Sequence, residues 1–454
     1  MSQYSTSTIC ALATAPGIGA IAIIRLSGED AITICNKVFK GKDLSKVESH
    51  TAHFGTIRDG EKIIDEVLVT VFKGRKSFTG ENSVEISTHG SPYIQQQVLQ
   101  LLLKNGAESA GPGEFTLRAF LNGKLDLSQA EAVADVIAAN SETSHELAMS
   151  QMRGGFSNEI QKLREELIHF ASLIELELDF GEEDVEFADR DDLKKLVTKL
   201  NTALISLISS FDYGNVIKTG VPVAIVGKPN AGKSTLLNSL LKEDRAIVSA
   251  IAGTTRDTIE EILNINGVQF RFIDTAGLRE TTDEIEKIGV DKAFEQIEKS
   301  AIYLYLFDIN ALSLKEVEAD LSQLNTEIPR LIIANKTDLV DATKLVEFDK
   351  LNCYFISAKE NNSIETLKDV LFKAVNERLV KTNDVVVTNA RHHEALSKAN
   401  ESLNTVLEGL ENNITGDFLA MDIRQALHQL GMITGDITTD DLLENIFSKF
   451  CIGK

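Results

Sequence analysis

Residues 227–234 read GKPNAGKS and have the composition and spacing of a phosphate-binding loop. The glycines allow backbone N–H groups to curve around phosphate oxygens at the start of a helix, where the helix dipole also favours an anion. In such a loop the ammonium of Lys233 neutralises the β- and γ-phosphate oxygens, and the hydroxyl of Ser234 binds Mg²⁺. The sequence therefore predicts a site for a nucleoside triphosphate.

Two further motifs follow in the order expected of a GTPase. In DTAG, Asp274 would hold the second shell of Mg²⁺ and the Gly277 N–H would meet the γ-phosphate. In NKTD, Asp338 can accept hydrogen bonds from guanine N1 and N2, a pattern that adenine does not offer. SAK at 357–359 would complete the base pocket. From these motifs we predict GTP binding by Asn230, Ala231, Gly232, Lys233, Ser234, Thr235, Asp274, Thr275, Ala276, Gly277, Asn335, Lys336, Asp338, Ser357, Ala358 and Lys359.

The residue that orients water for hydrolysis is not fixed by local chemistry. Leu278 stands where Ras-type GTPases have the Gln that performs this role, and a leucine side chain has no polar group to offer. Three nearby carboxylates are candidates, Glu280, Glu284 and Glu286, and a solvated switch helix is the alternative role for each.

The phosphate-binding loop also contains Asn230, whose amide oxygen could bind a monovalent cation beside the phosphates. A cation there would supply the positive charge that an arginine finger brings in other GTPases. SAIAGTTRD at 249–257 would be the first switch, with Thr255 reaching Mg²⁺ and backbone carbonyls from Ser249 to Ile251 facing the monovalent cation. A plain turn residue is the alternative role of Asn230.

These motifs need an α/β domain to position them, and the stretch from about 219 to 378 predicts one. Its apolar strands VPVAIVG, QFRFIDTAG, AIYLYLFD, RLIIANK and CYFISAK alternate with helices. Residues before about 120 mix strands with short helices, and residues from roughly 124 to 213 have a helical apolar period that returns after 378. Because the final segment would make a weak core alone, we expect it to pack against the earlier helices, with the α/β module inserted between them.

Length and composition fit a soluble multidomain protein. The 454 residues suggest about three domains. The net charge of −22 argues against a protein that coats nucleic acid through a broad basic surface. The four cysteines have no C-x-x-C spacing, which disfavours structural zinc and disulfides. With no secretory leader and no apolar run of about 20 residues, we expect a cytoplasmic protein without a membrane anchor.

Along its whole length the sequence resembles the family of tRNA modification GTPases called MnmE or TrmE. The matching stretches are IAIIRLSG, SFTGENSVEISTHGSP, GPGEFTLRAFLNGKLDLSQAEAVADVI, GKPNAGKSTLLN, IAGTTRDTIEE, IDTAGLRE, EKIGV and the terminal FCIGK. The resemblance implies a multidomain fold: an α+β folate-binding and dimerisation domain (1–122), an all-α helical domain in two parts (123–218 and 379–454, the second ending in CIGK), and an inserted α/β P-loop G domain (219–378).

The resemblance also implies GTP hydrolysis that potassium activates when two G domains meet. Glu286 would then orient water as a catalytic residue beside Lys233, and Arg279 and Asp257 would relay closure of the switches. Ser249, Thr254 and Thr255 would join the GTP contacts. The implied metal ligands are Asn230, Ser249, Ile251 and Thr254 for K⁺, and Ser234 and Thr255 for Mg²⁺.

The family works with a flavoprotein partner, MnmG, which carries FAD, in a heterotetramer built on a homodimer. Together they install an aminomethyl or carboxymethylaminomethyl group at C5 of the wobble uridine U34 of certain tRNAs. The one-carbon unit comes from a tetrahydrofolate derivative, in the 5-formyl or methylene form. The implied folate ligands are Arg25, Glu85, Lys124 and Lys454. Their chemistry suits a pterin edge and a glutamate tail, although without the resemblance each would be an ordinary surface or turn charge.

Two other functions compete with this one. An Era- or Der-type ribosome-assembly GTPase shares the G motifs but lacks the folate-like N-terminal segment and the CIGK end. A structural dimer with a vestigial nucleotide site is disfavoured because Lys233, Ser234, Asp274 and Asp338 are all present. The acidic composition suggests that tRNA is bound largely by the partner.

The chain ends in FCIGK, and Cys451 fits a prenylation box badly because Gly453 and Lys454 follow it. The preceding TTDDLLENIFSKF predicts a helix that packs one apolar face and holds the thiol at a defined place. Cys451 is thus either a catalytic residue near the one-carbon donor or a residue with a positioning role.

Overall fold

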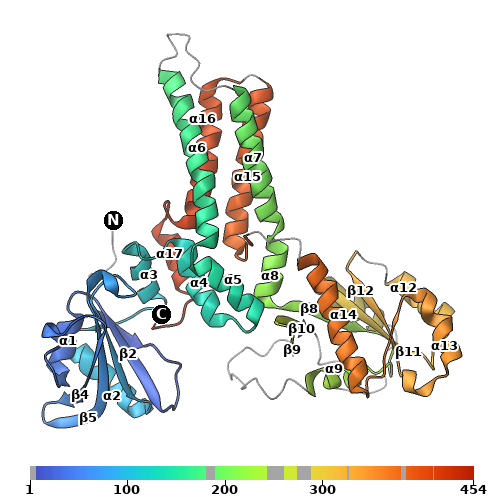
Figure 1. The fold of residues 1–454 in the computed structure, drawn as a ribbon, viewed down its shortest axis with the longest axis horizontal. Helices are drawn as coiled ribbons and strands as arrows, with labels where there is room; N and C mark the ends of the chain where they lie inside the picture. Colours follow the sequence, from blue (N-terminus) through green and yellow to red (C-terminus); the bar gives the residue numbers. More distant parts are fainter. Residues whose placement is uncertain are drawn as a thin grey trace. The chain divides into compact units, whose positions relative to one another are not determined.

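The computed structural model describes residues 7–179, 190–242, 260–273, 288–324, 327–379, 385–412 and 414–453 (Figure 1). Its contacts divide the chain into two compact units. The first comprises Met1–Ala138, Ala148–Asn201 and Ala395–Lys454, and the second comprises Ala139–Leu147 and Thr202–Glu394.

The first unit contains a seven-stranded sheet in the order β3-β4-β5-β6-β2-β1-β7. The strands are β1 (Ile9–Leu12), β2 (Ile21–Ser27), β3 (Phe39–Lys40), β4 (Thr51–Asp59), β5 (Lys62–Phe72), β6 (Ser83–His89) and β7 (Glu108–Ser109). The pairs are antiparallel except β1 with β7. Helices α1 (Ala31–Val38) and α2 (Pro92–Lys104) contribute with the sheet to a buried apolar core.

That core contains Ile24, Leu26, Val84 and Ile86. Because successive side chains of a strand point to opposite faces, Arg25 and its partner across the ladder point to the other face of the sheet.

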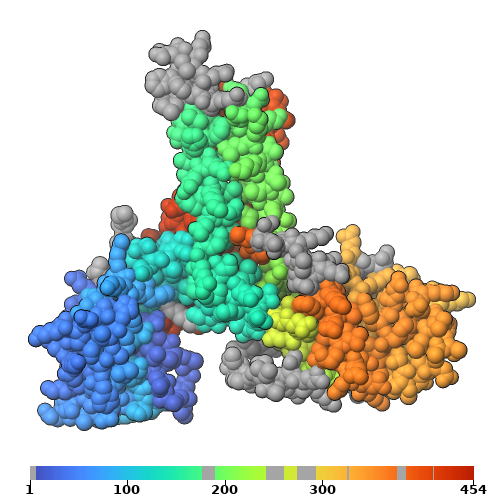
Figure 2. Space-filling view, viewed as in Figure 1, coloured from blue at the N-terminus to red at the C-terminus, as the bar shows by residue number. Residues whose placement is uncertain are grey.

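The rest of the first unit is helical. It is built from α3 (Glu114–Leu121), α4 (Leu127–Ala138), α5 (Glu142–Met152), α6 (Gly155–Asp179), α7 (Arg190–Ser209), α15 (Ala390–Glu411), α16 (Gly416–Thr434) and α17 (Asp440–Phe447), although α5, α7 and α15 each extend into the second unit. The late helices pack on the early ones, which is the packing expected for the final segment: α16 lies along α6, and Lys194 pairs with Glu411 at 2.9 Å (Figure 1). In Figure 2 the red C-terminal residues lie against the green helical segments.

The second unit is an α/β structure with a six-stranded sheet in the order β13-β12-β11-β8-β10-β9. The strands are β8 (Val221–Val226), β9 (Glu261–Ile265), β10 (Val268–Phe272), β11 (Ile302–Asp308), β12 (Arg330–Asn335) and β13 (Tyr354–Phe355). The pairs are parallel except β9 with β10, and the predicted apolar strands are confirmed.

The helices of this unit are α8 (Phe211–Thr219), α9 (Lys233–Lys242), α11 (Ile288–Glu298), α12 (Leu314–Gln323), α13 (Ala342–Phe348) and α14 (Asn361–Leu379). Two separate apolar cores include side chains of this sheet, one with α9 and α14 and the other with α12, so both faces are buried. Within the described segments of the chain, no helix is long and apolar enough to cross a membrane.

Candidate functional site

The phosphate-binding loop joins the end of β8 to the start of α9, and its two motif glycines are required by both conformation and space. Gly227 has φ 151°, and a Cβ there would lie 2.0 Å from the carbonyl oxygen of Leu306. Gly232 has φ 99°, and a Cβ there would lie 2.3 Å from Nδ2 of Asn335. A larger residue at either place would push the loop away from the sheet.

The ammonium of Lys233 folds back over this loop. Its Nζ donates to the carbonyls of Gly227 at 2.6 Å and Lys228 at 3.0 Å, and burial lowers the pKa of Lys233 from its ordinary value. A half-buried cation held by neutral carbonyls is stabilised further when an anion binds beside it. Asn230 is exposed with a left-handed backbone (φ 63°), and Ser234 is half-buried in the first turn of α9.

Asn335 has a role that the sequence analysis missed. Asn335 is buried, with only 1% of its surface exposed. Its Nδ2 donates to the carbonyl of Ala231 at 2.8 Å, and its Oδ1 accepts from the Ala358 N–H at 3.0 Å. The amide therefore braces the phosphate-binding loop against the SAK segment. Ser239 of α9 adds a second link, because its Oγ donates to the Ala358 carbonyl at 2.7 Å. The NKTD motif by itself does not predict that Asn335 braces the phosphate-binding loop.

The remaining base-pocket residues lie at the same edge of the sheet. Lys336 is left-handed (φ 66°), and its Nζ lies 2.7 Å from Oδ2 of Asp308 at the end of β11. Burial acts to raise the pKa of Asp308, but hydrogen bonds from Lys336 and Asn310 and the lysine charge outweigh it and lower that pKa. Asp338 is exposed in the turn that follows, Ser357 is buried, and the edge is the one where ligands bind in open α/β sheets.

Several predicted site residues lie outside the described residues. They are Ser249, Ile251, Thr254, Thr255, Asp274, Thr275, Ala276, Gly277, Glu286 and Lys454. Among the residues that are described, no group of three or more His, Cys, Asp or Glu side chains could hold a metal ion.

The predicted folate residues of the first unit are partly brought together. Nε and Nη2 of Arg25 donate to Oε1 of Glu85 at 2.9 and 2.8 Å, and the two side chains are 25% and 26% exposed. The guanidinium carbon lies 5.9 Å from the ring centre of Phe78 and 5.7 Å from that of Phe115. Such aromatic contacts favour a cation. Lys124 is exposed, and its ammonium donates to the carbonyl of Arg75 at 2.9 Å rather than to Glu85.

The C-terminal tail docks on the same sheet. The helix predicted before it is α17, whose apolar side chains pack with Leu117, Leu127 and Ala130, so that prediction is confirmed. Gly453 has φ 94°, and a Cβ there would lie 2.2 Å from the carbonyl oxygen of Leu12. Since Leu12 ends the strand that pairs with β2, the tail reaches the strand beside Arg25, where Cys451 is exposed.

Comparison with known proteins agrees with this architecture. The model described as "GTP-binding protein TrmE N-terminus" matches residues 8–124, and the model "MnmE helical domain" matches residues 127–451. A protein of Christiangramia forsetii named tRNA modification GTPase MnmE is 57% identical over 98% of this chain and 99% of its own length. A protein of the same name from Cytophaga hutchinsonii is 56% identical over 99% of this chain and 98% of its own.

Among solved structures, the FeoB G-domain from Methanococcus jannaschii is 26% identical over 34% of this chain and 98% of that chain, with a TM-score of 0.25. The two family models and the near full-length relatives lead to one conclusion. The chain belongs to the MnmE family.

Proposed function

We propose that this chain is a GTP hydrolase whose activity serves modification of tRNA. The observation that best supports the proposed hydrolase activity is the structure of the phosphate-binding loop. Asn335 ties this loop to the SAK segment, and Lys233 lies over the loop with its pKa lowered by burial. The relatives named tRNA modification GTPase match nearly the whole chain, which supports the same activity here. A ribosome-assembly GTPase is not favoured, because the match includes the N-terminal segment that such proteins lack.

In the proposed GTP site, Lys233 neutralises the phosphates and Asp338 selects guanine by accepting from N1 and N2. Asp338 is exposed at the end of the strand, where a base can reach it. The other GTP-binding residues keep the roles predicted from their motifs. Asn335 contributes by holding two loops at a fixed separation.

Mg²⁺ would be held by Ser234 and Thr255, and K⁺ by Asn230, Ser249, Ile251 and Thr254. The left-handed backbone of Asn230 and its exposure support the potassium role, because an exposed residue of the phosphate-binding loop is accessible to a cation from solvent. Glu286 would orient water. The test is the GTP hydrolysis rate in KCl against NaCl at equal ionic strength; a strong increase in KCl is expected, and equal rates would discard the cation mechanism.

A tetrahydrofolate derivative in the 5-formyl or methylene form would bind at Arg25, Glu85, Lys124 and Lys454. The pair of Arg25 with Glu85 supports this, since both of its hydrogen bonds use Oε1 and leave Oε2 to the pterin edge. A bound folate would supply the one-carbon unit of the modification. Cys451, exposed on the docked tail, is proposed as a nearby thiol with either a catalytic or a positioning role.

The proposed assembly is a homodimer that joins a flavoprotein of the MnmG type, with FAD on the partner. An exposed apolar pair supports the dimer: Phe54 of β4 lies opposite Leu68 of β5, and they are 70% and 45% exposed. The net charge of −22 supports tRNA binding mainly through the partner. The free cysteines support the cytoplasm as the location.

The domain boundaries 1–122, 123–218, 219–378 and 379–454 also remain our proposal. The N-terminal family model ends at residue 124 and the helical one begins at 127, which supports the first boundary.

The experiment that tests the proposed function is mass spectrometry of wobble nucleosides in tRNA from a strain that lacks this chain. Loss of 5-aminomethyl or 5-carboxymethylaminomethyl uridine is expected. Unaltered 5-substituted uridines would refute the tRNA role, and a purified chain that does not hydrolyse GTP would refute the hydrolase.

A further inference from the structure

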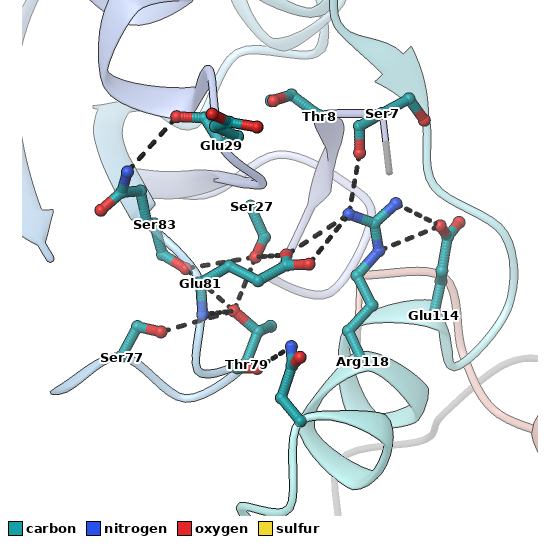
Figure 3. Close-up of polar contacts among 12 residues, drawn as sticks. Ser7, Thr8, Ser27, Glu29, Ser77, Thr79, Glu81, Ser83, Glu114 and Arg118 are labelled. Atoms are coloured by element: carbon teal, nitrogen blue, oxygen red, sulfur yellow. Dashed lines mark hydrogen bonds and ion pairs between the residues drawn. The ribbon is translucent and has the colours of Figure 1, made fainter. Parts of the chain in front are cut away.

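One buried guanidinium lies between two carboxylates (Figure 3), in segments of the chain that also carry the two rings facing Arg25. Arg118 of α3 has a side chain that is 6% exposed. Its Nη2 lies 2.8 Å from Oε1 of Glu114, and its Nη1 lies 3.3 Å from Oε2 of Glu81. A buried cation keeps its place when it has both charge partners and hydrogen bonds, and Arg118 has both.

On one side, Glu81 connects Arg118 to the loop before β6. Oγ of Ser27 donates to Oε2 of Glu81 at 2.7 Å and lies 2.6 Å from Oγ1 of Thr79, whose residue is fully buried (Figure 3). The neighbour of Thr79 in the chain is Phe78, the ring that faces the guanidinium of Arg25. These hydroxyl contacts therefore fix the segment that places the Phe78 ring beside Arg25.

On the other side, Glu114 connects Arg118 to the C-terminal tail. Its Oε2 accepts from the backbone N–H of Gly111 at 2.8 Å, which fixes the turn before α3. The same turn receives the tail, because the N–H of Gly113 donates to the carbonyl of Cys451 at 3.3 Å. The residues next to these two, 112 and 452, form an antiparallel bridge.

We propose that Arg118 is a positioning residue that holds the C-terminal tail and the 77–81 loop in register with the Arg25–Glu85 pair. The planar fork of the guanidinium contacts Glu81 of the 77–81 loop directly, so displacement of that loop breaks a charged hydrogen bond. It contacts the tail indirectly, because Glu114 of its own helix fixes the turn on which the tail docks. The effect on folate binding rests on the proposed function. The link from Arg118 through Glu114 to the tail does not depend on folate.

Hydrogen exchange of the full chain tests this link. Arg118→Lys keeps the charge but loses the fork, and Glu114→Gln keeps an acceptor for Gly111 but loses the charge. Because charged hydrogen bonds are the stronger ones, we expect amides in 110–114 and 448–453 to exchange about tenfold faster in Arg118→Lys, and faster by a smaller factor in Glu114→Gln. Arg58→Lys is the matched control, since Nε of Arg58 donates locally to Oγ1 of Thr56 two residues away, and it should leave these amides at the wild-type rate.

Wild-type exchange of the tail in both variants would overturn the positioning role, and Glu114→Gln decides the matter if Arg118→Lys does not fold. Calorimetry with 5-formyltetrahydrofolate supplies the second readout, in which we expect about fivefold weaker binding in Arg118→Lys with GTP binding unchanged. If the wild-type chain binds no folate, the proposed folate site fails, and the exchange result still decides the role of Arg118.

Discussion

The proposed nucleotide site of the second unit and the Arg25–Glu85 pair of the first are built in different ways. In the second unit, the described site segments are short motifs that follow parallel strands, and left-handed residues such as Asn230 and Lys336 shape their loops. In the first unit, Arg25 and Glu85 meet across antiparallel strands, and the tail beside them comes from the far end of the chain. A site made by local loops can be recognised from its own motifs, whereas the residues of one assembled by distant pairing are indicated here only by the family resemblance.

The largest effect is expected from Lys233→Ala, which removes the cation proposed to neutralise the GTP phosphates. We expect GTP hydrolysis to fall by about 10²-fold or more, as for loss of a preorganised charge-stabilising group. Folate binding in the first unit should stay at the wild-type level. Lys228→Ala is the matched control, because its ammonium pairs with Asp320 instead. Wild-type turnover in Lys233→Ala would show that the loop is not the hydrolytic site.

Asn335→Ala should show whether Asn335 acts by holding the loops of the proposed nucleotide site in place or by contacting the guanine base. The variant leaves the Ala358 N–H and the Ala231 carbonyl without their buried partner. This loss should lower the free energy of unfolding by about 1–3 kcal/mol. We expect a lower thermal midpoint and weaker GTP binding, measured by calorimetry. Wild-type stability with weak binding would instead assign Asn335 to the base alone.

Glu85→Gln should affect the first unit alone. The loss of one charged hydrogen-bond partner corresponds to roughly 1.5–3 kcal/mol, so we expect 5-formyltetrahydrofolate to bind about tenfold or more weakly in calorimetry. GTP hydrolysis should not change. Glu66→Gln, at an exposed position of β5, is a control on the same sheet. Equal folate affinity in the two variants would remove Glu85 from the site.

Thiol labelling should give the smallest change and tests the docked tail. Burial raises the pKa of Cys10 to about 11, that of Cys353 to about 11 and that of Cys35 to about 12, so little thiolate forms at these residues at pH 8. The exposed Cys451 should therefore account for one fast-reacting thiol per folded chain. Cys451→Ser should abolish the fast phase; its persistence would mean that another cysteine is accessible.

The sequence predicts much of the α/β unit because its signals are local. Alternating apolar strands and helices predict β8, β10, β11, β12 and β13, and the glycine spacing predicts the loop before α9. The brace at Asn335 is not predictable, since its partners at 231 and 358 come close only after the strands are ordered in the sheet.

In the first unit, the helical spacing of apolar residues in α17 predicts which face of this helix is buried. The packing of Leu443 and Phe447 confirms the prediction. The pairing of Arg25 with Glu85 depends on strand register, and the buried position of Arg118 depends on how α3 packs beside the loop that carries Glu81. Register follows from contacts between residues far apart in the chain, and a single sequence contains no direct record of them.

The most direct test of the whole account is complementation of a strain that lacks this chain, with wobble uridines measured by mass spectrometry. The wild-type gene should restore the 5-substituted uridine, while Lys233→Ala and Glu85→Gln should each fail to restore it, although each retains the ligand binding of the other site. Full restoration by both variants would contradict the claim that modification needs the two sites together.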